Sequence, residues 1–211
     1  MFERLRRFRL GFKRLRERLP LAAVGIEVFS IVLGVLLALG VNEWREASAN
    51  ERLARRALTQ IRGEVERNER VVADRHPYHM AALDSLESYA ETLDHGVSLD
   101  DVTAARLGFD RGGRFIPLYS SAHAAARSSG ALAHVDYETL SLLSEIYEVQ
   151  ATLMGQDDRV MGLLFAPDNL RPGTFYYTLS VAPGLMQDVV TSEATLLELY
   201  DRFQAAVPAE P

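Results

Sequence analysis

The stretch LAAVGIEVFSIVLGVLLALGV, residues 21–41, decides how this chain is organised, because every residue in it except Glu27 is apolar or small. As an α-helix rising about 1.5 Å per residue it would be about 32 Å long, enough to cross a hydrocarbon core of about 30 Å. We therefore predict a transmembrane helix over residues 21–42. The segments on its two sides differ in charge, and that difference predicts its orientation.

The first twenty residues are strongly basic. They hold eight Arg or Lys residues and two Glu residues, a net charge of +6, and because the whole chain of 211 residues carries −6, the rest carries −12. An excess of cations beside a span favours the cytoplasmic side. We predict a protein of the bacterial inner membrane with a cytoplasmic amino terminus and a periplasmic domain over residues 43–211.

Residues 1–20 also have a helical period, because Phe and Leu recur between the cations at three- and four-residue steps. This predicts a basic amphipathic helix on the anionic cytoplasmic leaflet. A nucleic-acid-binding arm is the alternative, but the apolar stripe would have no role on a phosphate backbone, so we expect the lipid bilayer and no nucleic acid as partner. The predicted membrane-interface anchors are Arg4, Arg7, Lys13, Arg14, Arg18 and Trp44.

Small residues repeat along one face of the predicted span. Ser30, Gly34 and Ala38 follow one another at four-residue intervals, and Glu27 projects onto the same face. Such a ridge lets a second helix approach closely. We predict that these four residues form a helix-association face for a second copy or another membrane protein. The alternative for Glu27 is that it reaches the cytoplasmic interface, about 10 Å away.

A cleaved signal peptide is the competing interpretation of this region, because Ala47-Ser48-Ala49 resembles a cleavage site. The apolar run is, however, longer than the roughly 7–15 residues of a signal-peptide core. Three charged residues, Glu43, Arg45 and Glu46, also lie next to the site. We therefore expect an uncleaved anchor.

The membrane segment resembles a known family. GIEV at residues 25–28, LGVLLAL at 33–39 and NEWRE at 42–46 are similar to the G-E-I, I-G-I-L-I-A-L and N-x-W-x-E segments of an uncharacterised family of bacterial single-pass inner-membrane proteins, with one extra residue, Ile26, here. AAARSSGAL at residues 124–132, followed by an Asp-x-Glu-x-Leu helix start, resembles a second hallmark of that family. The resemblance implies a single span and a helical periplasmic domain, and it lends no activity.

The rest of the chain is patterned as helices, so we predict an all-α protein with a helical bundle outside the membrane. One helix is expected over residues 43–75, and a turn at His76-Pro77 is expected to start a second one that ends near residue 95. A third helix start is expected near residue 98, and a loop over residues 108–117. A short helix over 120–127 should end at Gly130, and a long helix should follow Asp136 as its N-cap.

Residues 166–184 have no assigned state, and the last helix is expected from Thr191. The charges of residues 43–75 are interpreted as a solvated face, and the aromatic residues Phe175-Tyr176-Tyr177 as core. The core face of the second helix is predicted from Met80 onward at Leu83, Leu86, Ala90 and Leu93. That of the long helix is predicted at Leu140, Leu143, Tyr147, Met154, Met161 and Leu164.

Candidate chemistry is sparse. Cysteine is absent, and the five histidines lack the H-E-x-x-H spacing of a zinc site and are interpreted as helix-end and surface residues. No G-x-S-x-G elbow accompanies the serines near His123, and the RGGR stretch at residues 111–114 lacks the Lys-Ser/Thr of a phosphate loop. We expect no enzyme activity, cofactor or metal. The predicted function is that of an interaction or scaffold protein. The alternative is a ligand-sensing domain that signals through a partner, because twenty cytoplasmic residues are too few for a transmitter.

Overall fold

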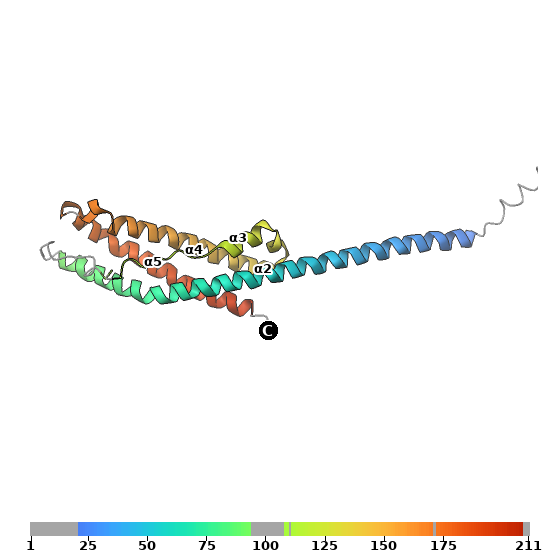
Figure 1. Ribbon diagram of the computed structural model, residues 1–211, viewed down its shortest axis with the longest axis horizontal. Helices are drawn as coiled ribbons and strands as arrows, with labels where there is room; N and C mark the ends of the chain where they lie inside the picture. The colour runs from blue at the N-terminus through green and yellow to red at the C-terminus, as the bar shows by residue number, and fades with distance from the viewer. Residues whose placement is uncertain (1–20, 94–107, 110, 171, 209–211) are drawn as a thin grey trace, which may run out of the picture. The chain divides into compact units, whose positions relative to one another are not determined.

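The computed structural model describes residues 21–93, 108–109, 111–170 and 172–208 (Figure 1). Within these residues the secondary structure is helical and contains no strand, which confirms the predicted all-α class. The elements are α2 (Leu21–Leu93), α3 (Ser121–Ser128), η2 (Ala131–His134), α4 (Tyr137–Leu164), η3 (Pro167–Leu170) and α5 (Pro172–Ala206). The predicted amphipathic helix of residues 1–20 and the predicted helix start near residue 98 lie outside the described residues.

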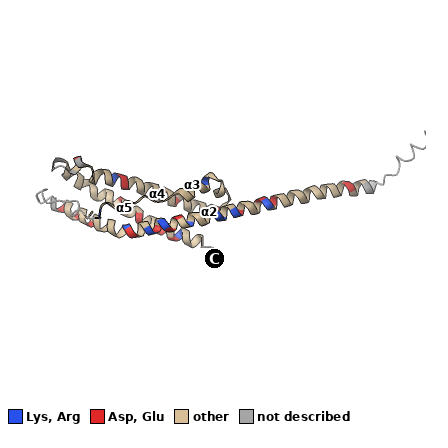
Figure 2. Ribbon diagram, in the orientation of Figure 1, with Lys and Arg blue, Asp and Glu red and all other residues tan. Residues whose placement is uncertain are grey.

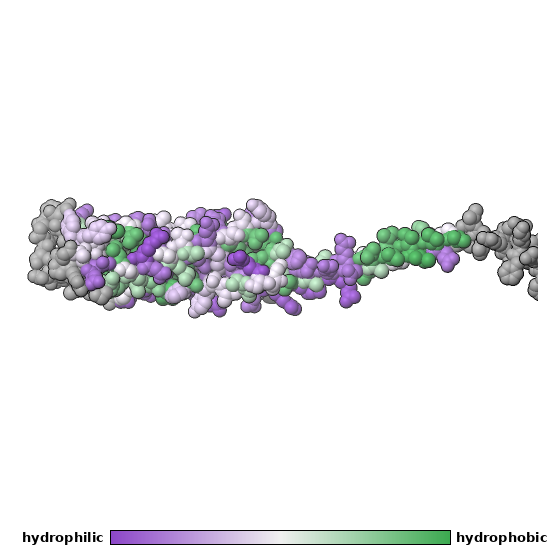
Figure 3. All heavy atoms as spheres, turned by 90° about the horizontal axis from the view of Figure 1, so that it is seen from above, coloured by the Kyte–Doolittle hydropathy of each residue, from purple (hydrophilic) through white to green (hydrophobic). Residues whose placement is uncertain are grey.

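The chain divides into two compact units, Met1–Glu51 and Arg52–Pro211. The described part of the first unit is the beginning of α2, and from residue 24 to 47 every residue on it is exposed. Figure 3 shows apolar side chains along most of this stretch and hydrophilic ones towards its end, whereas Figure 2 shows Arg, Asp and Glu distributed along α2 after it. The second unit contains the rest of α2, together with α3, α4 and α5.

The predicted turn at His76-Pro77 is wrong, because α2 runs without interruption through Pro77. A proline inside a helix removes one backbone hydrogen bond and leaves the carbonyl of the residue four positions earlier without its donor. Here both Pro77 and Ala73 are exposed, so water can hydrate that carbonyl. The neighbouring Arg75 and His79 are fully buried and paired with other elements, and these contacts hold the helix on both sides of the proline.

Buried residues on the three long helices follow a heptad period, alternating steps of three and four residues. This spacing is typical of helices that pack along a continuous seam. On α2 the seam is Ile61, Val65, Asn68, Val72, Arg75, His79, Ala82 and Leu86. On α4 it is Leu143, Ile146, Gln150, Leu153, Asp157, Val160 and Leu164. On α5 it is Leu179, Ala182, Met186, Val189, Glu193, Leu196, Tyr200 and Phe203.

The predicted core of α4 is therefore correct at Leu143 and Leu164 and wrong at both methionines. Met154 is 39% and Met161 43% exposed, because the polar Gln150 and Asp157 occupy seam positions and shift the buried face by one residue. On α2, Leu83 and Leu86 are buried as predicted, whereas Met80 is 48% exposed.

Local signals at the ends of α3 and α4 were interpreted correctly. Asp136 caps α4, because its Oδ1 accepts a hydrogen bond from the Thr139 backbone N–H at 2.9 Å. Gly130 follows α3 with a φ of +74°, a conformation that glycine adopts without a steric cost. Residues 112–120 form no regular structure, as predicted for most of this segment.

The last helix is longer than expected, since α5 begins at Pro172 and not near Thr191. Proline is favoured in the first turn of a helix, where its missing N–H costs nothing. The predicted core position is correct for Phe175, which is 4% exposed, and wrong for Tyr176 and Tyr177, which are 56% and 68% exposed. The apolar stripe that begins at Leu196 is buried as expected.

Candidate functional site

The predicted association face lies on the exposed part of α2. Glu27, Ser30, Gly34 and Ala38 are all exposed. A Cβ atom added to Gly34 would have no atom within 4 Å other than the nearby backbone of its own helix. Trp44 is 70% exposed on the same helix. The side chains of this face therefore touch no other described element. The other predicted anchors, Arg4, Arg7, Lys13, Arg14 and Arg18, lie outside the described residues.

A row of buried polar residues on α2 is the main feature that the sequence interpretation missed. Glu64, Asn68, Arg75 and His79 are fully buried, so the interpretation of this region as a solvated face, and of the histidines as surface residues, is wrong at these positions. The available signal was their spacing, because Asn68, Arg75 and His79 continue the heptad of the apolar residues around them. Each of the four side chains is partnered by a segment distant in sequence.

Glu64 provides the N-terminal cap of α3. Its carboxylate accepts hydrogen bonds from the backbone N–H of Ala122 at 2.7 Å and of His123 at 3.4 Å, while Ser120 gives this helix no side-chain cap. A carboxylate at a helix N-terminus satisfies free N–H groups and complements the helix dipole. The Tyr147 hydroxyl of α4 donates to the same carboxylate at 2.8 Å. One side chain of α2 thus fixes both α3 and α4.

The other three polar residues bind the backbone of the segment 112–120. Asn68 forms a double hydrogen bond with Tyr119, because its Nδ2 donates to the carbonyl oxygen and its Oδ1 accepts from the N–H, both at 2.8 Å. Arg75 Nη1 donates to the Ile116 carbonyl at 3.1 Å, and His79 Nε2 donates to the Gly113 carbonyl at 2.8 Å. Backbone groups of an irregular segment need such partners where they face the protein interior. The row on α2 therefore holds this segment in place.

Arg75 and His79 also belong to a buried charged cluster that joins three helices. Arg75 Nε lies 2.7 Å from Glu193 Oε1 of α5, and Arg75 Nη1 lies 3.1 Å from Asp157 Oδ2 of α4. His79 Nδ1 is 2.7 Å from Glu193 Oε1, and His76 Nδ1 is 3.2 Å from Glu193 Oε2. Burial raises the pKa of Asp157 to about 6, although the nearby Arg75 opposes this rise.

The charged cluster is suited to fix structure and not to meet a substrate. Both ring nitrogens of His79 are engaged, and Arg75, His79 and Glu193 are fully buried. Buried ion pairs add little net stability, but a polar residue in a heptad seam specifies register, because a shifted helix would leave the charge unpaired. Among the described residues no three His, Asp or Glu side chains are grouped as metal ligands.

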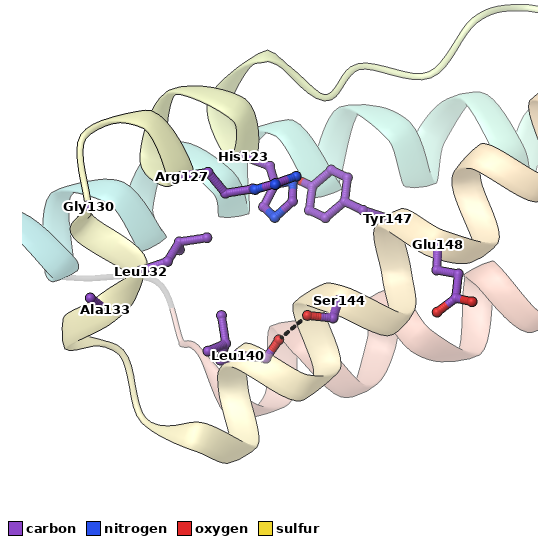
Figure 4. Close-up of a pocket in the computed structure, with 9 residues that line it drawn as sticks. All are labelled: His123, Arg127, Gly130, Leu132, Ala133, Leu140, Ser144, Tyr147 and Glu148. Atoms are coloured by element: carbon purple, nitrogen blue, oxygen red, sulfur yellow. Dashed lines mark hydrogen bonds between the residues drawn. The ribbon is translucent and has the colours of Figure 1, made fainter.

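A pocket of about 600 Å³ opens between α3, η2 and α4 (Figure 4). His123 stacks face to face on Tyr147, with ring centroids 3.9 Å apart and planes 7° from parallel. Burial and, secondly, the positive charge of Arg127 lower the pKa of His123, against the effect of Glu64. The full lining is His123, Arg127, Gly130, Leu132, Ala133, Leu140, Ser144, Tyr147 and Glu148.

The loop at residues 111–114, interpreted as a plain loop, packs on α2. Arg114 has a φ of +50° and forms an ion pair with Asp74, and its guanidinium lies 5.5 Å from the ring centre of Tyr78. These contacts attach the loop to the exposed side of α2.

The chain matches no family model, no curated protein and no solved structure. The resemblance to a family of single-pass membrane proteins stays a prediction.

Proposed function

We propose that this protein is a membrane-anchored interaction or scaffold protein of the bacterial inner membrane. The observation that carries the proposal is the exposed apolar surface of α2, which is long and apolar enough to cross a membrane and is not buried in the fold at its most apolar part. Folded chains in water rarely leave so large an apolar surface uncovered, whereas a bilayer covers it without cost. The +6 charge of the first twenty residues supports a cytoplasmic amino terminus and a periplasmic bundle.

The proposed association surface is the face of Glu27, Ser30, Gly34 and Ala38, and the proposed partner is a second copy of this chain or another membrane protein. In lipid the hydrophobic effect does not bring helices together, so close packing at small residues and hydrogen bonds between helices do so. Glu27 supports this role, because an ionisable group inside a membrane is costly unless it faces protein or reaches the interface.

A quantitative dimerisation assay in membranes tests the proposal. Gly34→Leu should weaken association, because its side chain separates the two backbones, and Val32→Leu on another face is the matched control. Glu27→Gln keeps hydrogen-bonding capacity and should be tolerated. Glu27→Leu should weaken association about two- to threefold, since hydrogen bonds between membrane helices average about 0.6 kcal/mol. Unchanged association for both Gly34→Leu and Glu27→Leu would show that this face does not hold two copies of the chain together.

A second candidate function, ligand sensing with signalling through a partner, is favoured by one observation. The pocket beside α3 contacts Tyr147, whose hydroxyl is bonded to Glu64 of α2. A molecule in this pocket would therefore touch Tyr147, the hydrogen-bond partner of the carboxylate that fixes α3 to α2, and α2 is the helix that carries the apolar segment. Photo-crosslinking of the full chain in intact membranes, followed by mass spectrometry, would identify the partner that either function needs.

A further inference from the structure

Two side chains capable of donating hydrogen bonds lie on one wall of the pocket beside α3. His123 and Arg127 are one helical turn apart, and Figure 4 shows both directed along the pocket's rim. Among the described residues neither side chain makes a hydrogen bond or an ion pair. The stacking contact with Tyr147 fixes the His123 ring without using its nitrogens. This wall therefore presents two unused donors to whatever enters, the fixed ring of His123 and the solvent-exposed guanidinium of Arg127.

The opposite wall of the pocket is apolar. It is formed by Leu132 and Ala133 of η2 and by Leu140 of α4, and Leu132 is only 8% exposed. A pocket of about 600 Å³ lies in the usual range for small-molecule sites, roughly 300–1,000 Å³. An apolar wall facing a few polar groups is the usual arrangement of such sites, because the apolar surface supplies affinity and the polar groups supply orientation.

The cation and the anions around the pocket lie apart, and this places a single negative group of the ligand at the Arg127 end. Arg127 is the only permanent cation in the lining, and burial, with the charge of Arg127, lowers the pKa of His123 against the opposing charge of Glu64, which favours the neutral ring. Glu148, at the other end of the pocket in Figure 4, would repel a second negative charge. A guanidinium offers two parallel N–H groups, which match the two oxygens of a carboxylate.

We propose that this pocket binds a small monocarboxylate with a compact apolar body. The carboxylate lies against Arg127 and His123, and the body lies against Leu132 and Leu140. The proposal supplies the ligand class for the sensing function and rests on that function. The bound molecule would contact His123 and Tyr147, one hydrogen bond away from Glu64.

Calorimetric titration of the full chain in lipid nanodiscs tests the ligand class. The probes are 3-phenylpropanoate, 3-phenylpropan-1-ol and 3-phenylpropylamine, which share one apolar body and differ in charge, and empty nanodiscs correct for partition into lipid. We expect the carboxylate to bind at least about tenfold more tightly than the alcohol, because hydrogen bonds to a charged group are stronger than those to a neutral one. The amine should bind more weakly than both.

Variants test the position of the ligand. Arg127→Gln should weaken carboxylate binding about tenfold, while Arg159→Gln, an exposed cation of α4 outside the pocket, should not change it. Ala133→Phe fills the pocket and keeps both donors, so it should remove binding. Circular dichroism confirms that each variant folds. The proposal would be overturned by a Kd for the carboxylate weaker than about 10 mM, or by an alcohol that binds as tightly as the carboxylate. It would also be overturned by an amine that binds more tightly than the carboxylate, or by an unchanged affinity of Arg127→Gln for the carboxylate.

The same probe separates this proposal from the sensing function. Crosslinking to the partner is repeated with and without 3-phenylpropanoate in wild type and in Arg127→Gln. If 3-phenylpropanoate changes the crosslinking pattern in wild type and not in Arg127→Gln, the result supports both the ligand site and the sensing function. Binding that leaves the pattern unchanged contradicts the sensing function and retains the ligand site.

Discussion

Asp157 should make the stability of the bundle depend on pH. Its carboxyl group keeps its proton up to about pH 6 in the folded chain and releases it near 3.8, the ordinary value, in the unfolded chain. Between these values the folded chain binds more protons than the unfolded chain, so the free energy of unfolding falls as pH rises. This loss of stability is absent below about pH 4 and complete above about pH 6.

The size of this contribution follows from the two pKa values. One pKa unit corresponds to about 1.4 kcal/mol, so the shift from 3.8 to about 6 amounts to about 3 kcal/mol. Asp157→Asn cannot titrate at this position and should lose this part of the pH dependence. Asp158→Asn changes an exposed carboxylate on the adjacent residue and should keep it.

The measurement is urea unfolding of the full chain in uncharged detergent micelles, from about pH 4 to about pH 7. Near-ultraviolet circular dichroism of the tyrosines reports on the bundle, because all eight tyrosines of the chain belong to the second unit, Arg52–Pro211. We expect the wild-type free energy of unfolding to fall relative to that of Asp157→Asn by about 3 kcal/mol over this range. Parallel curves for the two proteins would refute the reasoning.

Three further results are expected. Glu64→Ala leaves the N-terminus of α3 and the Tyr147 hydroxyl without their acceptor and should cost about 3 kcal/mol in urea unfolding, whereas Glu66→Ala, a half-exposed partner of Arg62, should cost below about 1 kcal/mol. A reporter active only in the periplasm should function when fused after residue 211, and activity of a cytoplasmic reporter there would contradict the orientation. Mass spectrometry of the mature protein should find residues 1–46, and a new amino terminus at Asn50 would instead show cleavage.

Features that depend on neighbouring residues were determined by the sequence itself. The apolar run over residues 21–41 needs no tertiary partner to be recognised, because its length and composition alone suit a bilayer. Asp136 as an N-cap and Gly130 after α3 were also predicted, since a cap is a contact between residues a few positions apart. The all-α class follows from the helical period of the apolar residues.

Only the tertiary structure decided which polar residues of the helices are buried in the seams. Arg75 looks like one more solvated arginine in a charged helix, and its burial depends on Asp157 and Glu193, which are 82 and 118 positions away in the sequence. The same contacts carry α2 through Pro77, where the local rule predicted a turn. A buried charge is tolerated only where partners from other helices meet it, and one residue's sequence neighbourhood does not contain those partners.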